Sequence, residues 1–340
     1  MKIAIVTDAW EPQVNGVVRT LQAVRAELAR MGHIVELITP DRFRSLPCPT
    51  YPEIRLAMAG ATAVGRAIEA AAPDALHIST EGPLGLAARR WCMRRGLPFT
   101  TAYHTQFPEY VAARTGVPAE WTWRGMRWFH APSAAVLAST ATVRRSLRAH
   151  GISNVRHWGR GVDLDRFRPD APPLPHFDGL ARPIQLYVGR VAVEKNIEAF
   201  LETRHPGTRV VVGDGPARAA LARRYPDAIF LGALSGDALA GAYAGADLLV
   251  FPSRTDTFGL VMIESLACGT PVAAYPVPGP ADILDPEISC LDENLETAIA
   301  NALTRDRGRC AEFGRRFSWE ASARQFLDAL VLFDPARQAA

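Results

Sequence analysis

One stretch in the second half of the chain decides the class of fold: Leu248-Leu-Val-Phe-Pro-Ser-Arg-Thr-Asp-Thr-Phe-Gly-Leu-Val-Met-Ile-Glu264. Its first four residues are apolar and end at Phe251, which predicts a short buried strand. A polar loop follows, and we expect a helix to begin near Gly259, capped by Asp256 or Thr257. A buried strand that leads directly into a helix is the building unit of a parallel α/β sheet.

The same alternation of apolar runs and helical spacing extends over the whole chain. Apolar residues recur at helical spacing from Leu21 to Met31, and Gly32 follows them as a typical left-handed C-cap. Strands alternating with such helices predict parallel, doubly wound sheets. The expected strands are Lys2–Thr7, Ile34–Thr39, Ala75–Ser79, Phe99–Tyr103, Val136–Ala138, Ile184–Val188, Arg209–Val212, Ala228–Leu231, Leu248–Phe251 and Pro271–Ala274.

The length of the chain indicates two domains. At 340 residues and 37.0 kDa the chain exceeds what one α/β core usually fills. Five prolines between Arg168 and Pro183 disfavour both helix and sheet, so this segment is expected to be a linker and hinge between two separately wound domains. From its pattern alone, the last helical stretch, Trp319–Leu332, could pack on either domain.

The composition excludes several classes of protein. With 48% hydrophobic and 21% charged residues and a mean hydropathy of 0.00, the chain is neither disordered nor a multi-span membrane protein. Five scattered cysteines without a C-x-x-C pair are typical of reduced thiols, and not of a zinc site or a disulfide scaffold. Because the chain opens directly on an apolar strand, with no signal-peptide pattern, we expect a cytoplasmic location.

Charge is distributed unevenly along the sequence. Residues 1–160 hold 20 basic and 11 acidic residues, whereas the remaining 180 residues hold 18 basic and 24 acidic. A basic first half indicates an anionic partner such as a membrane surface, a phosphate or a nucleic acid. Arginine-rich composition without function is the alternative, since the chain has 36 arginines and only 2 lysines.

Two cations are expected at the end of one strand in the second half. Arg190 and Lys195 follow the Ile184–Val188 strand, close to the start of the next helix. Backbone N–H groups at a helix start already favour anions, so two cations there could hold a diphosphate and stabilise it as a leaving group. A solvated surface pair is the alternative for an isolated arginine and lysine at this spacing.

Other strand ends carry residues that suit a nucleotide or a sugar. The carboxylates of Asp256 and Glu264 could accept hydrogen bonds from sugar or ribose hydroxyls, and Gly16 would allow a close backbone approach to a phosphate. His104 ends the Phe99–Tyr103 strand and could donate to a sugar hydroxyl or stabilise developing charge. For each of them the alternative is a solvated carboxylate, a plain turn or a structural histidine.

Taken together, these motifs resemble the retaining glycosyltransferases of family 4. The residues that carry the resemblance are Gly189-Arg190, Glu194-Lys195-Asn196, Gly213-Asp214-Gly215-Pro216, Thr255-Asp256-Thr257-Phe258-Gly259 through Glu264, Tyr103-His104-Thr105 and Gly161-Val162-Asp163. The resemblance implies an α/β fold of the GT-B type, in which two Rossmann-like doubly wound domains face a central cleft. It implies an acceptor-binding domain at residues 1–165 and a nucleotide-sugar-binding domain at 166–318, with a C-terminal helix at about 319–340 packing back on the first.

The resemblance also implies roles for individual residues. Arg190 and Lys195 would grip the donor diphosphate, and Glu264 would hold the ribose. His104 would lie near the transferred sugar, so the expected catalytic residues are His104, Arg190 and Lys195. The expected donor-binding residues are Gly16, Gly189, Arg190, Lys195, Gly213, Asp256, Phe258, Gly259, Leu260 and Glu264.

Asp256 departs from the family pattern, which has two glutamates separated by seven residues. Asp is one methylene shorter than Glu, so the Asp256 carboxylate would reach less far toward the donor sugar than the glutamate of the family pattern. Within the family, His104-Thr105-Gln106-Phe107-Pro108-Glu109-Tyr110 and Ser79-Thr80-Glu81-Gly82-Pro83 resemble the members that glycosylate lipids, including sulfoquinovosyl-, glucosyl- and glucuronosyltransferases, and the related α-mannosyltransferases.

The resemblance therefore implies a metal-independent, retaining transfer of a sugar from a nucleotide-sugar donor to a membrane lipid. Glucuronic acid or glucose on a UDP-linked donor is the main interpretation, with diacylglycerol or ceramide as acceptor. A GDP-mannose-dependent α-mannosyltransferase is the alternative, followed by a nucleotide-sugar epimerase of the same fold. No cofactor is expected besides the nucleotide-sugar co-substrate.

The acceptor or membrane side is inferred from composition. Six of the seven tryptophans lie in the basic half, where Trp121, Arg124, Arg127 and Trp128 mix interfacial aromatic residues with arginines. Together with Glu81 they are the candidate acceptor-side residues, and they favour a peripheral enzyme on the inner face of the cell membrane. Tryptophans buried in the core beside solvated arginines are the alternative.

Other classes of protein fit the sequence less well. A nicotinamide dehydrogenase would carry G-x-G-x-x-G after the first strand, which is missing here, and no recognised nucleic-acid-binding module is present. A two-domain binding protein would not need Arg190, Lys195 and Glu264 together. Asp163-Leu164-Asp165 spells the D-x-D of metal-dependent glycosyltransferases, but it lies at the domain crossing, so no metal site is expected.

Overall fold

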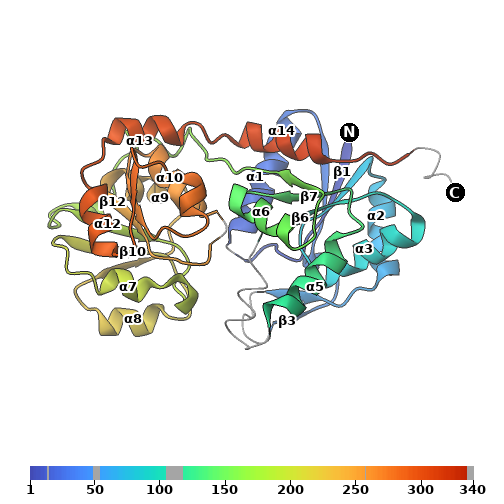
Figure 1. Ribbon diagram of the computed structural model, residues 1–340, viewed down its shortest axis with the longest axis horizontal. Helices are drawn as coiled ribbons and strands as arrows, with labels where there is room; N and C mark the ends of the chain where they lie inside the picture. The colour runs from blue at the N-terminus through green and yellow to red at the C-terminus, as the bar shows by residue number, and fades with distance from the viewer. Residues whose placement is uncertain (14, 49–53, 105–117, 257, 335–340) are drawn as a thin grey trace. The chain divides into compact units, whose positions relative to one another are not determined.

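The computed structural model describes residues 1–13, 15–48, 54–104, 118–256 and 258–334, and its contacts separate the chain into two compact units. We call Met1–Gly159 together with Trp319–Ala340 the N-terminal unit, and Arg160–Ser318 the C-terminal unit. The structure divides the chain after Gly159, whereas the sequence-based boundary lies after residue 165. The last helix is grouped with the N-terminal unit. Figure 1 shows that each unit is built from strands and helices in alternation.

The N-terminal unit is built on a six-stranded sheet with the order β2-β1-β5-β6-β7-β8, in which every neighbouring pair is parallel. Its strands are β1 (Lys2–Val6), β2 (Ile34–Ile38), β5 (Ala75–Ile78), β6 (Thr100–Tyr103), β7 (Ala135–Ala138) and β8 (Val155–His157). Its helices are α1 (Gly16–Arg30), α2 (Ala61–Ala71), α3 (Pro83–Arg95), α5 (Ala119–His130), α6 (Ala141–Ala149) and α14 (Trp319–Ala329). A small antiparallel hairpin adds β3 (Ser45–Pro47) and β4 (Arg55–Ala57).

Alternation along β1 explains why helices cover both faces of this sheet. Ile3 and Ile5 point to one face and pack in a cluster with α1 and α14, whereas Ala4 and Val6 pack in another with α2 and α3. Side chains at successive strand positions point to opposite faces, so a strand buried on both faces reads as a continuous apolar run. Helix α14 packs against α1.

The C-terminal unit has a second six-stranded parallel sheet, with the order β11-β10-β9-β12-β13-β14. Its strands are β9 (Ile184–Val188), β10 (Thr208–Val212), β11 (Ile229–Gly232), β12 (Leu248–Phe251), β13 (Val272–Ala274) and β14 (Ser289–Leu291). Its helices are α7 (Ile197–Leu201), α8 (Arg218–Arg224), α9 (Gly236–Gly245), α10 (Leu260–Ala267), α11 (Pro280–Ile283), α12 (Leu295–Ala302) and α13 (Arg307–Gly314).

Each sheet has one point where the strand order reverses. In the N-terminal unit β1 lies between β2 and β5, and in the C-terminal unit β9 lies between β10 and β12. At this point two adjacent strands, β1 and β5 or β9 and β12, are followed by connections that run in opposite directions along the sheet. In doubly wound sheets this divergence leaves a crevice outside the carboxyl ends of the two strands. Ligands of doubly wound sheets bind at this switch point, so the residues after β1 and β5, and after β9 and β12, are the first candidates for a site.

The proline-rich segment before β9, which the sequence predicts to be a linker and hinge, packs into the C-terminal unit. Ala171, Leu174 and Phe177 are buried in the core of the C-terminal unit, together with Phe167. Proline prevents regular structure but does not prevent packing, and the apolar residues between the prolines supply the buried surface. The segment is therefore part of the C-terminal unit.

Candidate functional site

The switch point of the C-terminal unit brings two chain segments together. Arg190 follows β9 after one glycine, and the loop from Pro252 leads from β12 toward α10. Asn196 connects the two segments, because its side-chain amide donates to the carbonyl oxygen of Pro252 at 3.1 Å. The strand-end residues that the sequence singles out in this half are thus neighbours in space.

Lys195 and Asp256 form an ion pair across this crevice. Nζ of Lys195 lies 2.6 Å from Oδ1 of Asp256, and the two side chains are 22% and 23% exposed. The other carboxylate oxygen, Oδ2, is buried and has no hydrogen-bond partner in the described part of the chain. Asp256 does not cap α10, contrary to the sequence-based expectation, because its carboxylate is turned to the lysine; Thr257 lies outside the described residues.

Arg190 also has a carboxylate partner close by in sequence. It pairs with Glu194, and the arginine side chain is 37% exposed. The hydroxyl of Tyr187 donates to the carbonyl oxygen of Arg190 at 2.9 Å, which fixes the backbone at the strand end. Burial, together with the charge of Asp256, raises the pKa of the Tyr187 phenol, so this hydroxyl remains a neutral donor.

The helix after Lys195 contributes less than the sequence suggests. Val193–Lys195 forms a single 3-10 turn, Asn196 adopts a left-handed conformation with φ of 54°, and α7 has only five residues. A helix of this length has a weak dipole, because the dipole is the sum of aligned peptide units. Charge at this site comes chiefly from the side chains of Arg190 and Lys195.

Glycines at the ends of β9 and β10 let two backbones approach closely. Gly189 and Gly213 have φ of 153° and 142°, and a β-carbon at Gly213 would overlap the carbonyl oxygen of Gly189. The amide of Gly189 donates to the carbonyl oxygen of Val212 at 3.0 Å. Gly213 is therefore required by the contact between the strand ends, independently of any ligand.

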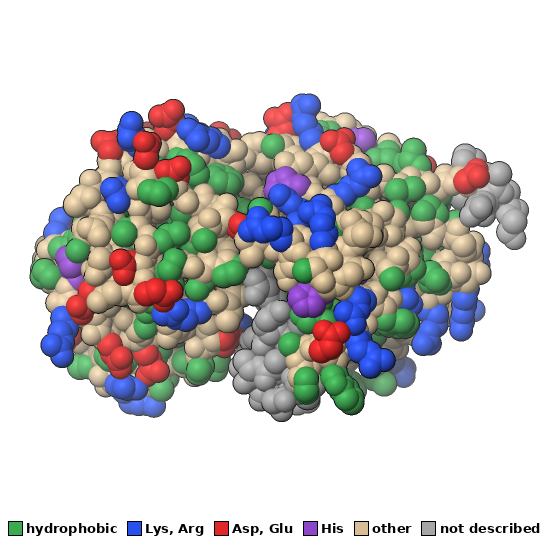
Figure 2. Space-filling view, viewed as in Figure 1, with side chains coloured by type: hydrophobic (Ala, Val, Ile, Leu, Met, Phe, Trp, Pro, Cys, Tyr) green, Lys and Arg blue, Asp and Glu red, His purple; other side chains and the backbone are tan. Residues whose placement is uncertain are grey.

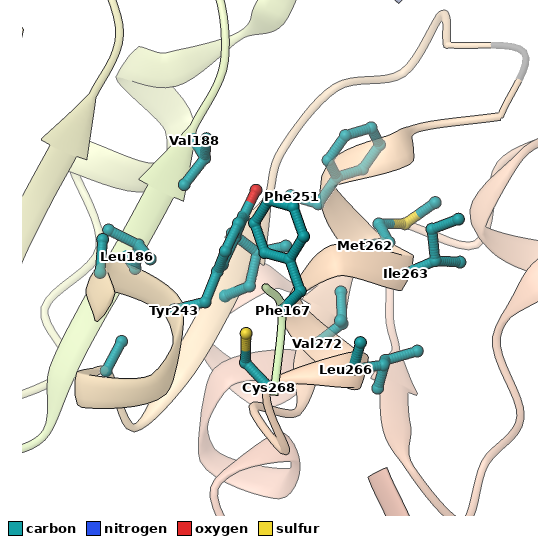
Figure 3. Close-up of a cluster of buried hydrophobic side chains, with 14 of the residues drawn as sticks. Phe167, Leu186, Val188, Tyr243, Phe251, Met262, Ile263, Leu266, Cys268 and Val272 are labelled. Atoms are coloured by element: carbon teal, nitrogen blue, oxygen red, sulfur yellow. The ribbon is translucent and has the colours of Figure 1, made fainter. Parts of the chain in front are cut away.

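Glu264 lies in the second turn of α10 and is almost completely buried, at 4% exposed. The hydroxyl of Tyr243 on α9 donates to Oε2 of Glu264 at 3.0 Å. Figure 3 shows the Tyr243 ring beside Phe167, within a cluster that includes Leu186 and Val188. A tyrosine hydroxyl in an apolar cluster holds the carboxylate in one orientation.

Three neighbouring residues of the candidate donor set differ in what they expose. The side chain of Phe258 is buried and packs edge-to-face against Phe317, so its ring belongs to the core of the C-terminal unit. Gly259 is the N-cap of α10 with φ of 83°, and Leu260 begins the helix without a side-chain cap. The first backbone N–H groups of α10 are left without an intrahelical acceptor, as at any helix start.

The switch point of the N-terminal unit carries the residues expected near a sugar. Nε2 of His104 lies 3.0 Å from the hydroxyl oxygen of Ser79, which joins the ends of β6 and β5. Gly16 is the first residue of α1, and the side chain of Asn15 caps the helix by accepting from the amides of Val17 and Val18. The helix has no acidic residue in its first turn, so the N-terminal end keeps its positive potential.

A buried carboxylate, Asp8, lies at the same edge of the sheet and caps a helix. Asp8, which sequence reasoning missed, is buried after β1 and accepts from the Thr80 hydroxyl at 2.8 Å and from the amides of Leu84 and Gly85 at 2.8 and 3.2 Å. Burial raises the pKa of Asp8 against the effect of these hydrogen bonds, and the charge of Glu81 adds to the rise. Asp8 therefore acts as a cap for α3. A polar residue directly after the first strand is the signal that could have revealed it.

Four of the candidate acceptor-side residues, Trp121, Arg124, Arg127 and Trp128, lie on α5, whereas Glu81 follows β5. Trp121 and Trp128 are 71% and 56% exposed, whereas Trp123, on the opposite side of the same helix, is buried. Arg89 stacks on the Trp128 ring at 3.9 Å, and Arg127 pairs with Glu120 at 2.8 Å. Figure 2 shows Lys and Arg side chains gathered over α5 and α6. The helices contribute Arg124, Arg127, Arg144, Arg145 and Arg148.

The D-x-D sequence and the cysteines do not form a metal site in the described part of the chain. Asp163 of the D-x-D sequence pairs with Arg166 at 2.9 Å, and the described residues contain no cluster of three or more histidine, cysteine or acidic side chains suited to a metal ion. All five cysteines are free thiols. Among the helices of the described residues, none has the length and apolar character needed to cross a bilayer.

Comparison with known proteins assigns the chain to a family. Residues 14–166 match the Glycosyltransferase Family 4 domain, and residues 182–305 match the Glycosyl transferases group 1 domain. The chain is 32% identical over 349 residues to a GDP-mannose-dependent alpha-mannosyltransferase of Mycobacterium tuberculosis, covering 93% of this chain and 91% of the relative. The protein belongs to glycosyltransferase family 4.

Other family 4 relatives and solved structures agree with this assignment. The chain is 27% identical to the alpha-monoglucosyldiacylglycerol synthase of Streptococcus pneumoniae, over 81% of this chain and 71% of the relative. The structure is similar to that of a sucrose-phosphate synthase from Thermosynechococcus elongatus, with a TM-score of 0.76 and 24% identity over 96% of this chain and 97% of the other. This likeness confirms the GT-B fold, and the family makes the protein a glycosyltransferase of the retaining type.

Proposed function

We propose that this family 4 enzyme transfers mannose from GDP-mannose to a hydroxyl of a membrane-lipid headgroup, with retention of the anomeric configuration. The observation that carries the proposal is the similarity, over nearly the whole chain, to a GDP-mannose-dependent α-mannosyltransferase. It favours the alternative that the sequence left open over the main interpretation of a UDP-linked glucuronic acid or glucose donor. Similarity to a diacylglycerol glycolipid synthase supports a lipid acceptor.

The charges at the C-terminal switch point suit a diphosphate. Arg190 and Lys195 pair with Glu194 and Asp256, and a diphosphate with two negative charges could exchange for these carboxylates. The cations then stabilise the charge that develops on the departing nucleoside diphosphate. Glu264, fixed by Tyr243, is the carboxylate suited to the ribose hydroxyls, and Gly16, Gly189, Gly213, Gly259 and Leu260 are proposed to bring backbone close to the donor.

The retaining reaction proceeds, in this proposal, without a protein nucleophile. The bond between the anomeric carbon and the diphosphate oxygen breaks, the acceptor oxygen attacks the same face, and the diphosphate takes the proton of the acceptor hydroxyl. His104, oriented by Ser79, is placed to stabilise the sugar, so the protein supplies orientation and charge stabilisation. No cofactor is proposed besides the co-substrate. One carboxylate of the D-x-D sequence is already bound to Arg166, which supports a metal-independent reaction.

A donor panel tests the proposed function. The purified enzyme is incubated with radiolabelled GDP-mannose, UDP-glucose or UDP-glucuronate, with diacylglycerol or ceramide in mixed micelles, and NMR of the product gives the anomeric configuration. We expect an α-mannosyl lipid from GDP-mannose, formed equally well with EDTA. Transfer from a UDP-sugar with none from GDP-mannose contradicts the proposed donor, and free epimerised sugar without a lipid product would indicate an epimerase.

We further propose that the enzyme acts as a peripheral protein on the inner, anionic face of the cell membrane. Two exposed tryptophans on α5, beside arginines of α5 and α6, combine interfacial aromatic rings with positive charge. Flotation with vesicles tests this: we expect binding to vesicles that contain anionic lipid, and loss of binding in Trp121→Ser/Trp128→Ser. Buried Trp123 is left unchanged so that the fold is preserved, and equal flotation of the variant contradicts the proposal.

A further inference from the structure

A buried histidine, His130, contacts the carboxylate of Glu81 at the switch point of the N-terminal unit. His130, the last residue of α5, is fully buried, and its Nε2 lies 3.3 Å from Oε1 of Glu81, which follows β5. The other ring nitrogen, Nδ1, lies 2.8 Å from the hydroxyl oxygen of Thr101 on β6. Nε2 has no hydrogen-bond partner of standard geometry in the described part of the chain, so its contact with the Glu81 carboxylate is a close electrostatic one, which a proton on Nε2 makes favourable.

Glu81 keeps capacity to bind a ligand, unlike its neighbour Asp8. Asp8 accepts three hydrogen bonds from the start of α3 and from Thr80, so its oxygens are occupied. Apart from His130, the residues that the structure describes give the carboxylate of Glu81 no hydrogen-bond or ion-pair partner, and its side chain is 27% exposed. Because Oε1 of Glu81 contacts His130, the other oxygen, Oε2, remains available to accept a hydrogen bond from a ligand.

The position of Glu81 points to the reacting part of the unit. It lies two residues after Ser79, whose hydroxyl contacts His104, and it follows β5 at the switch point. Asp8 lies close enough to Glu81 that two carboxylates disfavour an anion at this place; burial chiefly, and then the charge of Glu81, raises the pKa of the Asp8 carboxyl. A neutral group that donates a hydrogen bond, such as a hydroxyl of a sugar or glycerol, fits these two carboxylates best.

We infer that Glu81 binds a hydroxyl of the acceptor headgroup, and that His130 is the positioning residue that orients Glu81. The inference rests on the proposed glycosyl transfer, because it concerns the acceptor of that reaction. It does not depend on the identity of the donor sugar. It selects headgroups with neutral hydroxyl groups over headgroups that offer only a phosphate.

Direct binding tests this inference without any donor. The probe is n-octyl β-D-glucopyranoside below its micelle concentration, followed by ligand-observed NMR, and n-octyl phosphate serves as the probe that lacks sugar hydroxyls. We expect Glu81→Gln to weaken binding of the glucoside by about tenfold, as for a lost hydrogen bond to a charged group. Glu69→Gln, which removes a carboxylate paired with Arg95 on the surface of the same unit, should bind as the wild type does.

Two substitutions separate positioning by His130 from a purely structural role. His130→Asn keeps a polar atom near the Nδ1 position but loses the one facing Glu81, whereas His130→Gln places an amide near the Nε2 position. We expect His130→Asn to weaken glucoside binding and to raise the acceptor KM by about fivefold to tenfold, and His130→Gln to restore most of both. The donor KM should not change in either variant.

A second buried histidine, His77, offers a matched control; it lies on β5, the strand beside β6. His77 on β5 is also fully buried, and its Nδ1 lies 2.9 Å from the hydroxyl oxygen of Thr100, but within the described ranges of the chain no carboxylate pairs with it. His77→Asn should lower thermal stability as much as His130→Asn does, and leave glucoside binding unchanged. Unchanged binding in Glu81→Gln, equal effects of both His130 variants, or no glucoside binding by the wild type overturns the inference. Failure of the proposed donor would instead show as absence of transfer from GDP-mannose.

Discussion

The two switch points of this protein carry opposite arrangements of charge. In the C-terminal unit, Arg190 and Lys195 each pair with a carboxylate, and either cation could exchange that partner for an anionic ligand. In the N-terminal unit, the groups at the corresponding place are carboxylates, Asp8 and Glu81, held by neutral donors and a histidine. The same type of sheet thus carries one site suited to an anion and a second site suited to hydroxyl groups. This is possible because the residues that contact a ligand lie in the loops after the strands and not in the sheet itself.

The largest expected effect concerns the cations of the C-terminal unit. Lys195→Ala should lower kcat/KM for sugar transfer by about a hundredfold or more, since it removes a charge that stabilises the leaving diphosphate. The loss leaves Asp256 buried without its partner, so the double variant Lys195→Ala/Asp256→Asn is measured as well. Steady-state kinetics checks activity, and thermal unfolding checks the fold.

The control for Lys195 is a surface cation of the same unit. Arg224 pairs with Glu198 and with Glu202 away from the switch point, so Arg224→Ala should retain full transfer activity. Near-normal turnover in both Lys195 variants would show that the cation does not stabilise the leaving group, and would remove the contrast between the two switch points.

A smaller effect concerns the stability of the two units in acid. Burial lowers the pKa of His77 to about 3, compared with 6.5 in an unfolded chain. The unfolded state therefore binds a proton that the folded state does not, and stability falls as pH falls from 6.5 toward 3. Between pH 7 and pH 5 this one group should remove about 2 kcal/mol from the free energy of unfolding of the N-terminal unit.

Urea denaturation at the two pH values measures this loss, and His77→Asn should lack it. The corresponding buried polar residue in the sheet of the C-terminal unit is Gln185, which does not titrate and donates to the carbonyl oxygen of Pro206 at 2.9 Å. The N-terminal unit should therefore become the less stable of the two as the pH falls. The same pH dependence in wild type and His77→Asn would refute the assignment of the loss to this side chain.

The smallest expected effect concerns the tyrosine that holds Glu264. Tyr243→Phe removes the hydroxyl that donates to the carboxylate and should raise the KM for the nucleotide-sugar about fivefold, with little change in kcat. Tyr225 offers a matched control, because its hydroxyl donates to Glu202 at 2.8 Å on the surface, and Tyr225→Phe should leave the donor KM unchanged. A lower kcat with an unchanged KM would place Tyr243 outside ribose binding.

Local patterns in the sequence predicted most of the two sheets. Continuous apolar runs mark strands buried on both faces, which is why strands such as β1, β9 and β12 could be placed within about one residue. Strands β8 and β14 and the hairpin of β3 and β4 were missed, because their three-residue runs mix polar or proline residues with apolar ones, whereas β13, equally short, is wholly apolar. The proline-rich segment was misjudged because its buried residues, such as Leu174 and Phe177, are separated by prolines.

The candidate site could be predicted only in part. The order of strand and loop placed Arg190 and Lys195 after the end of β9, and Glu264 in the helix that follows β12, as the topology requires. Their partners could not be found in the same way, since Lys195 meets Asp256 61 positions further along the chain. Such pairs depend on the register of the strands and on the path of the loops, which no local pattern contains.

The scarcity of lysine has a practical consequence for studying this protein. Lys2 and Lys195 are the only lysines among 340 residues, and Lys195 is partly covered and paired with Asp256. An amine-reactive ester would therefore find three targets in the chain, the two lysines and the α-amino group. The extent of acylation at Lys195, followed by peptide mass spectrometry, would report occupancy of that crevice with no engineered label.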